Sequence, residues 1–271
     1  MQYKDILING ISLVSKRWNI TLIPESIPAK RGENVSVPYL DGRRFVKKNY
    51  DERREILNMY VLPFDESGMV PAGKTIRQQL EENIEYLKWL FGSSGRLLEY
   101  RKKMIDDTWR KAYVEVTSVI QFDRKTEGSN YRIFSVELLF PEPFFYDETE
   151  TSDIVSPDQS TYSFVHNNKG TAMAKKMSIE LSGGLINPKI INETMGVWFQ
   201  VNQSITAGTT VTLDTEKFEV TDNNGNNLIH TIIHSGDPIW MIFASGDKSL
   251  KVICDSTPNG TITFKYNAHY F

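Results

Sequence analysis

Two histidines, His230 and His234, stand four residues apart, a spacing that brings two metal ligands together when both lie on one helix. The surrounding residues, 228–236, instead predict a strand followed by a turn at Ser-Gly. Four residues of strand span about 13 Å, too far for two ligands of one ion. We therefore expect two partly exposed strand histidines and no metal site.

The polar run from Asp222 to Asn227 resembles a calcium-binding loop. When Gly225 takes the place of the loop glycine, the first ligand position falls on Val220 and the bidentate position on Thr231. Neither side chain can fill its position. Asn and Gly adopt positive φ readily, so the run predicts a hairpin tip, and a looser calcium site is the alternative.

Nucleophilic or acid–base chemistry finds little support in the sequence. Cys254 is the only cysteine, which excludes an intramolecular disulfide and fits a reducing compartment; its strand-like neighbours predict a packing role. The pair Asp106 and Asp107 fits a turn between strands better than a cleft. No phosphate-binding loop or nucleophile elbow is present. We expect no catalytic residue, no cofactor and no enzyme.

Trp198 and Trp240 are the two candidates for stacking on sugars, because exposed aromatic side chains of a β-sandwich can bind carbohydrate. Both lie in apolar runs, Val197-Trp198-Phe199 and Ile239-Trp240-Met241-Ile242, and these runs favour packing in the core. A carbohydrate-binding module that recognises the host cell wall is the alternative function.

Charge divides the chain into two halves. Residues 1–146 carry 23 Lys and Arg against 20 Asp and Glu, a net charge of +3. Residues 147–271 carry 8 against 14, a net charge of −6, and all 12 arginines lie in the first half. Arginine is favoured at interfaces that bind carboxylates in a bidentate manner. The scattered basic pairs suit solvated faces or subunit contacts, with nucleic acid as the competing partner. These pairs are Lys30-Arg31, Arg43-Arg44, Lys47-Lys48, Arg53-Arg54 and Arg101-Lys102-Lys103.

The first half predicts mixed α and β structure. Its clearest element is a helix at 75–91, with apolar residues at helical spacing, a capping box of Thr75 and Gln78, and Gly92 at its end. An Asn-Gly hairpin is expected at 3–13 and further strands follow. The expected strands are 18–23, 56–62, 96–100, 111–121 and 131–140.

The second half predicts an all-β sandwich of about ten short strands, after a Pro141-Glu142-Pro143 stop and a polar, acidic boundary at 147–159. The fold class is therefore mainly β with one main helix, in two domains, 1–146 and 147–271. The expected strands are 162–166, 177–181, 189–192, 197–201, 209–214, 217–221, 229–233, 240–243, 250–254 and 261–266.

The N-terminus becomes charged at once, and no apolar run approaches the roughly 20 residues of a membrane span. We therefore expect neither an export signal nor a bilayer crossing.

Several stretches together resemble the distal tail proteins of siphophages. The first is the run Asn9-Gly10-Ile11-Ser12-Leu13, followed by 27–42, a Pro, Arg and Gly stretch that leads through a short strand to the turn Asp41-Gly42. In the second half, Asn168-Lys169-Gly170-Thr171 resembles the family's Asn-x-Gly-Thr start, and Asn187-Pro188 its Asn-Pro strand. Ala207-Gly208-Thr209 resembles the family's Ala-Gly-Glu turn, with Thr209 in place of the acidic residue.

The resemblance implies an α+β belt domain at 1–146 that forms a hexameric ring, and a peripheral galectin-like β-sandwich at 147–271. It implies a structural virion protein, the hub that connects the tail tube to the tail tip or baseplate. The implied partners are copies of itself, the tail tube protein, and tail-tip fibre or lysin proteins, with DNA only passing through the lumen. It implies assembly in the host cytoplasm and a final place at the phage tail tip.

Overall fold

The structure is a computed structural model. It describes residues 5–22, 28–31, 35–36, 43–44, 49–92, 95–118, 121–123, 128, 130–174, 176–235 and 246–271. The chain forms two compact units, Met1–Phe145 with Phe271, and Tyr146–Tyr270. Tyr146 thus falls with the second unit, and Phe271 falls with the first.

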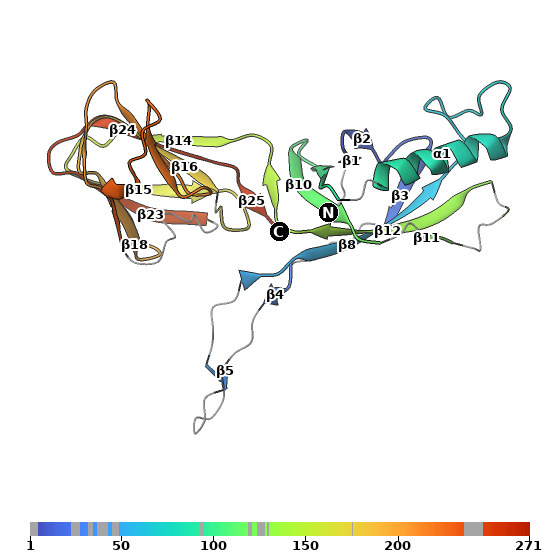
Figure 1. The fold of residues 1–271 in the computed structure, drawn as a ribbon, viewed down its shortest axis with the longest axis horizontal. Coiled ribbons are helices and arrows are strands. Elements are labelled where there is room, and N and C mark those ends of the chain that lie inside the picture. The colour runs from blue at the N-terminus through green and yellow to red at the C-terminus, as the bar shows by residue number, and fades with distance from the viewer. Residues whose placement is uncertain are drawn as a thin grey trace. The chain divides into compact units, whose positions relative to one another are not determined.

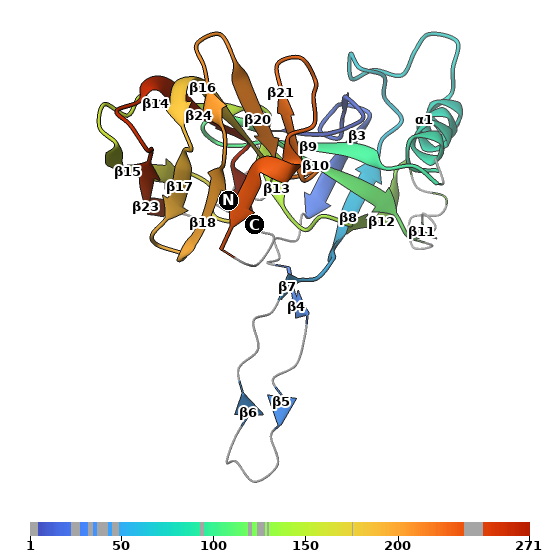
Figure 2. The same cartoon turned by 60° about the vertical axis from the view of Figure 1, so that its left-hand side comes forward.

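The first unit is built on a curled antiparallel sheet in the order β2-β1-β9-β10-β12-β8-β3, and β11 pairs with β12 (Figure 1). Two short pairs, β4 with β7 and β5 with β6, precede β8 (Figure 2). The bounds are β1 Asp5–Ile8, β2 Ile11–Ser12, β3 Trp18–Leu22, β4 Lys30–Arg31, β5 Val35–Ser36, β6 Arg43–Arg44, β7 Asn49–Tyr50, β8 Arg53–Val61, β9 Leu98–Lys103, β10 Trp109–Val116, β11 Gln121–Phe122 and β12 Arg132–Phe140.

Helix α1, Ile76–Phe91, lies against one face of this sheet (Figures 1 and 2). Its apolar stripe, which includes Leu80, Ile84 and Leu87, is buried. The expected capping box is present: the Thr75 hydroxyl accepts a hydrogen bond from the backbone N–H of Gln78, and the Gln78 side chain accepts one from the Thr75 N–H. The start of the helix is therefore set by local sequence, as predicted. The helix ends at Gly92, as expected, where the Gly92 N–H donates to the Lys88 carbonyl with a φ of −79°.

The last residue of the chain packs in the first unit. The ring centroid of Phe271 lies 5.0 Å from that of Tyr50 and 5.7 Å from that of Phe144. The chain therefore leaves the first unit after Phe145 and returns to it at its end.

The second unit is a sandwich of two antiparallel sheets, ordered β14-β24-β16-β20-β21 and β15-β23-β17-β18-β22, with β19 paired to β16. Rings from the two sheets meet in the core, where the centroids of Phe164 and Phe264 are 6.0 Å apart. The bounds are β13 Phe145–Asp147, β14 Thr151–Val155, β15 Thr161–Asn168, β16 Met177–Ile186, β17 Lys189–Asn192, β18 Val197–Val201, β19 Ser204–Ile205, β20 Thr210–Asp214, β21 Glu219–Asp222, η2 Ile229–Thr231, β22 Ile232–His234, β23 Gly246–Ile253, β24 Asn259–Tyr266 and β25 His269–Tyr270.

The structure confirms the mainly β fold class and corrects some of its details. The acidic stretch at 147–159 contains strand β14, which pairs with β24, so it is more than a connection. Residues 229–231 form a 3₁₀ turn ahead of β22. The strand expected at 240–243 lies outside the described residues. Within the described residues, no helix has the length and apolar character needed to cross a bilayer.

Candidate interaction surfaces

The two histidines of the second unit lie apart in local structure. His230 belongs to the 3₁₀ turn and His234 ends β22, and both are exposed. The expectation of two strand histidines was therefore wrong for His230. Among the described residues, no group of three or more His, Cys, Asp or Glu side chains could hold a metal ion.

The Asp222 loop is a turn that its own side chain organises. One carboxylate oxygen of Asp222 accepts hydrogen bonds from the backbone N–H groups of Asn224 and Asn226, at 2.9 and 2.8 Å. The Asn226 side-chain amide donates a third bond to the other carboxylate oxygen, at 2.8 Å. This side-chain bond, followed by the backbone bonds, lowers the pKa of Asp222. Gly225 has a φ of +81°, as a hairpin tip requires. The carboxylate is occupied by its own turn, in line with the hairpin prediction.

The two candidates for nucleophilic or acid–base chemistry, Cys254 and the pair Asp106–Asp107, have structural roles. Cys254 is buried, and burial raises the pKa of its thiol to about 11, so the reactive thiolate form is suppressed. Asp106 and Asp107 form the turn between β9 and β10, where Asp106 accepts hydrogen bonds from both the hydroxyl and the backbone N–H of Thr108.

A basic and aromatic patch lies on the half-exposed side of β9 and β10. Arg101 stands opposite Lys111 and Lys103 opposite Trp109 in the strand register. The guanidinium of Arg101 lies 5.0 Å from the Trp109 ring centroid, and the Lys103 ammonium lies 3.1 Å from the Asp107 carboxylate. This patch gives one face of the first unit a positive, partly apolar character suited to carboxylate-bearing partners.

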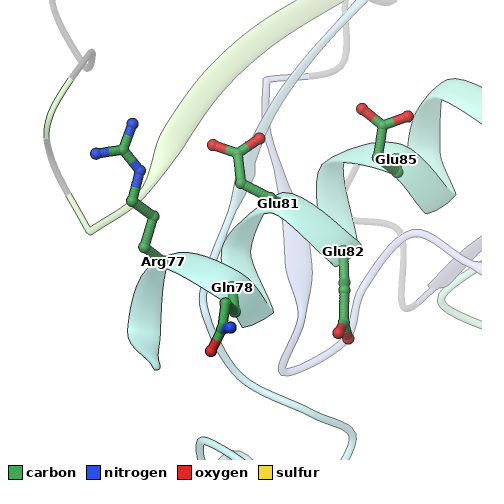
Figure 3. Close-up of a pocket in the computed structure, with 5 residues that line it drawn as sticks. All are labelled: Arg77, Gln78, Glu81, Glu82 and Glu85. Atoms are coloured by element: carbon green, nitrogen blue, oxygen red, sulfur yellow. The ribbon is translucent and has the colours of Figure 1, made fainter. Parts of the chain in front are cut away.

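The outer side of α1 bears a shallow, open depression (Figure 3). Figure 3 shows that every lining side chain projects from this one helix: Arg77, Gln78, Glu81, Glu82 and Glu85. Gln78 is engaged in the capping box, and Glu82 accepts a hydrogen bond from Lys74 at 2.5 Å. A depression without a second wall does not enclose a ligand, so we interpret this surface as a solvated face of mixed charge, on which Lys88 also pairs with Glu85.

The first unit also buries charged side chains. Arg53 and Glu55 form an ion pair at the start of β8, and their side chains are 3% and 0% exposed. The Arg53 guanidinium lies 5.1 Å from the Phe145 ring centroid, and the ammonium of buried Lys102 lies 4.3 Å from the same centroid. Two cations thus contact the ring where the chain leaves the first unit.

The cluster of Arg53, Glu55 and Lys102 around Phe145 was not predicted from the sequence, because Arg53 and Lys102 were interpreted as parts of solvated basic runs. Strand periodicity would have found Arg53 and Glu55, because they continue the alternation of Leu57, Met59 and Val61 on the buried face of β8.

Trp198 is on the outer face of the sandwich, so the expected core packing was wrong. Its strand neighbours Phe199 and Val201 point inward and are fully buried, which turns Trp198 outward as a half-buried side chain. The Lys189 ammonium lies 3.7 Å from the Trp198 ring centroid. Trp240, the other candidate for stacking on sugars, lies outside the described residues.

At one edge of the sandwich, a buried histidine bridges the two sheets. The Nδ1 atom of His166 on β15 lies 2.8 Å from a carboxylate oxygen of Asp153 on β14. Burial lowers the pKa of His166, and the Asp153 charge opposes that shift. Burial also raises the pKa of neighbouring Tyr266 to about 12.

Among solved structures, the chain is similar to the Dit protein of phage SPP1, described as a paradigm of the hub adsorption apparatus in phages that infect Gram-positive bacteria. Sequence identity is 14%, the TM-score is 0.66, and the match covers 97% of this chain and 98% of that one. The chain has the fold of a phage hub protein. This fold extends over both units, and the resemblance to siphophage distal tail proteins expected from the sequence is confirmed at the level of the fold.

Two baseplate structures of phage p2, in the activated conformation with strontium and with calcium, match at 6% identity with TM-scores of 0.42 and 0.41. The strontium form covers 97% of this chain and 96% of that one, and the calcium form covers 98% of each. No protein-family model matches the sequence, and no curated protein matches it either.

Proposed function

We propose that this protein is a structural virion component, the distal tail hub of a long-tailed phage, and not an enzyme. The observation that carries the proposal is the hub-protein fold, which spans nearly the whole length of both chains. A fold shared over both units supports a shared architecture better than a match to one unit does, because β-sandwiches alone serve many functions.

In this proposal the first domain, 1–146, is the belt that assembles into a ring, and the second domain, 147–271, is a peripheral galectin-like sandwich. The ring has six copies and joins the tail tube to the tail tip or baseplate. Its neighbours are the tail tube protein and tail-tip fibre or lysin proteins, and DNA passes only through its lumen. Assembly takes place in the host cytoplasm, and the finished hub stays in the virion.

Heterologous contacts generate such a ring, because each copy presents two different surfaces to its two neighbours. The first unit has charged surfaces that could serve as such contacts. The patch of Arg101, Lys103, Lys111 and Trp109 is basic. The outer side of α1 carries three glutamates, but Glu82 is paired with Lys74 and Glu85 with Lys88, so the carboxylates that it offers to a neighbouring copy are partly neutralised. Salt should weaken a ring that uses such exposed charges.

Immunogold labelling of the assembled phage tests the role. Antibody against the full chain is expected to label one end of the tail, at the tip. Label along the whole tube, on the capsid, or absent from the virion would contradict the hub proposal.

Electron microscopy of the purified chain tests the stoichiometry separately. A ring with six lobes and a central hole is the expected particle. A closed ring of another order would correct the copy number and leave the hub role intact. A particle that stays monomeric at high concentration, and also in reconstituted tails, would overturn the ring.

A further inference from the structure

The outer face of the five-stranded sheet presents polar, aliphatic and aromatic side chains in two aligned rows. Residues that alternate with the core point outward from β17, β18 and β23, because Ile190, Phe199 and Val252 point inward and are buried. The strand register aligns two rows across this face. One row is Ile233, Gln200, Lys189, Ile253 and Thr161, and the other is Trp198, Ile191, Lys251 and Ser163.

Trp198 and Lys189 occupy diagonal positions on neighbouring strands, since Trp198 faces Ile191 and Lys189 faces Gln200. The Lys189 ammonium rests 3.7 Å from the indole centroid. A cation over a partly exposed ring is held weakly, because water competes for the ammonium. This ammonium is therefore able to move to a stronger anionic partner beside the ring.

Two other polar side chains lie on the same outer face. Gln200 is the direct neighbour of Lys189 and donates a hydrogen bond to the Asn187 carbonyl at 3.3 Å, and Lys251 lies two strands from Trp198 in the same row. Lys251 lies 3.8 Å from the Glu193 carboxylate, so that carboxylate already screens part of its charge. Amide and hydroxyl groups next to an aromatic surface are what a sugar ring requires, because its C–H face is apolar and its hydroxyl groups need hydrogen bonds.

We propose that this face binds an anionic saccharide, with the indole of Trp198 against the sugar ring and the Lys189 ammonium paired with the acidic group. Gln200 offers the sugar hydroxyls its carbonyl oxygen and the amide N–H that does not bond the Asn187 carbonyl. This site goes beyond the hub function, which stands or falls on its own tests. The acidic group is a carboxylate or a phosphate, since an ammonium acts as a point charge toward either.

When the saccharide binds, the indole exchanges the ammonium for the sugar ring, and the ammonium exchanges the indole for the acidic group. The ammonium leaves the ring face, which opens that face to the C–H groups of the sugar, and forms an ion pair of higher strength at the ring edge. A neutral sugar lacks the anion that draws the ammonium away and is therefore expected to bind more weakly.

Calorimetric titration of the full chain tests the site with three probes: chitotetraose, which is neutral, a hyaluronan tetrasaccharide, which carries carboxylates, and a phosphorylated oligomannose. Binding of at least one anionic probe, weakened by added salt, is expected. The probe that binds identifies the acidic group. Trp198→Ala and Lys189→Met are each expected to reduce affinity by about tenfold, the size of one modest contact.

Two matched variants serve as controls. Lys217→Met removes an exposed lysine elsewhere in the second unit, and Trp89→Phe alters an exposed tryptophan of the first unit; both should bind like the unaltered chain. Circular dichroism establishes that each variant is folded, and Lys189→Met keeps the test open if Trp198→Ala unfolds. Absence of binding to all three probes, equal binding of the neutral probe, or unchanged affinity in folded Trp198→Ala and Lys189→Met would overturn the site.

Discussion

The two units place their charged groups differently. The first unit buries Arg53 and Glu55 as an ion pair against aromatic rings, while in the second unit the buried His166 of β15 pairs with Asp153 of β14, whose side chain is 41% exposed. Desolvating two charges costs free energy that their attraction only partly returns. The buried pair of the first unit therefore contains both charges, whereas the buried histidine of the second unit has a counter-charge that reaches solvent.

Breaking the buried pair is the largest expected effect. Glu55→Gln leaves the Arg53 guanidinium buried without a counter-charge and should lower the free energy of unfolding by about 3–5 kcal/mol. Replacing both residues with methionine should restore most of that loss. Urea unfolding, followed by fluorescence and circular dichroism, measures both variants.

A second ion pair close by provides the matched control. Arg54 and Glu52 lie 2.7 Å apart, but both side chains are exposed to solvent. Glu52→Gln should therefore leave the urea midpoint unchanged within error. An equal loss in Glu52→Gln and Glu55→Gln would show that burial does not govern the pair, and the contrast between the units would fail.

The sandwich edge of the second unit should respond to pH. Because burial lowers the pKa of His166 in the folded state, the unfolded chain binds a proton first as pH falls below about 6.5. Stability should therefore be full above that pH and decline below it until the folded histidine also titrates. Asp153, Tyr266 and the cross-strand neighbour Lys248 are the ionisable groups that face it.

The measurement is the thermal midpoint of the full chain across this pH range. His166→Gln should flatten the decline, while a histidine-to-glutamine change at exposed His230 should not. A decline that persists unchanged in His166→Gln would assign it to other groups.

The smallest expected effect tests the helix cap. Thr75→Ala removes the hydroxyl that accepts a hydrogen bond from the Gln78 N–H and should cost about 1 kcal/mol of stability. Thr75→Ser keeps the acceptor and should lose little. Denaturant midpoints of the two variants decide between them, and equal losses would argue that the hydroxyl is not the stabilising group.

Local sequence predicted the elements whose determinants are local. The capping box of α1 and the Asn9-Gly10 hairpin depend on neighbouring residues, and both are present as expected, with φ values of +48° and +80° in the turn. Trp198 was misplaced because its apolar neighbours were taken as evidence of burial. Phe199 and Val201 face the core and Trp198 alternates with them, so strand alternation was the better guide.

The buried pair Arg53 and Glu55 shows a second limit of prediction from the sequence. Alternation along β8 assigns their face, but only the fold brings the rings of Phe140 and Phe145 over the guanidinium. Lys102 is similar, since alternation with Leu98 and Tyr100 assigns its buried side, but only the fold brings the Phe145 ring to its ammonium. Partners that are distant in sequence cannot be read from spacing within one strand.

The return of Phe271 to the first unit has a mechanical consequence. Because the chain crosses between the units after Phe145 and again before Phe271, a force that pulls on the sandwich is divided between one covalent connection, at Phe145–Tyr146, and one non-covalent anchor, the packed ring of Phe271. Tension on the C-terminal connection must also extract an aromatic ring from its contacts with Tyr50 and Phe144 before the chain can extend. A single linker would transmit the same pull through one strand alone.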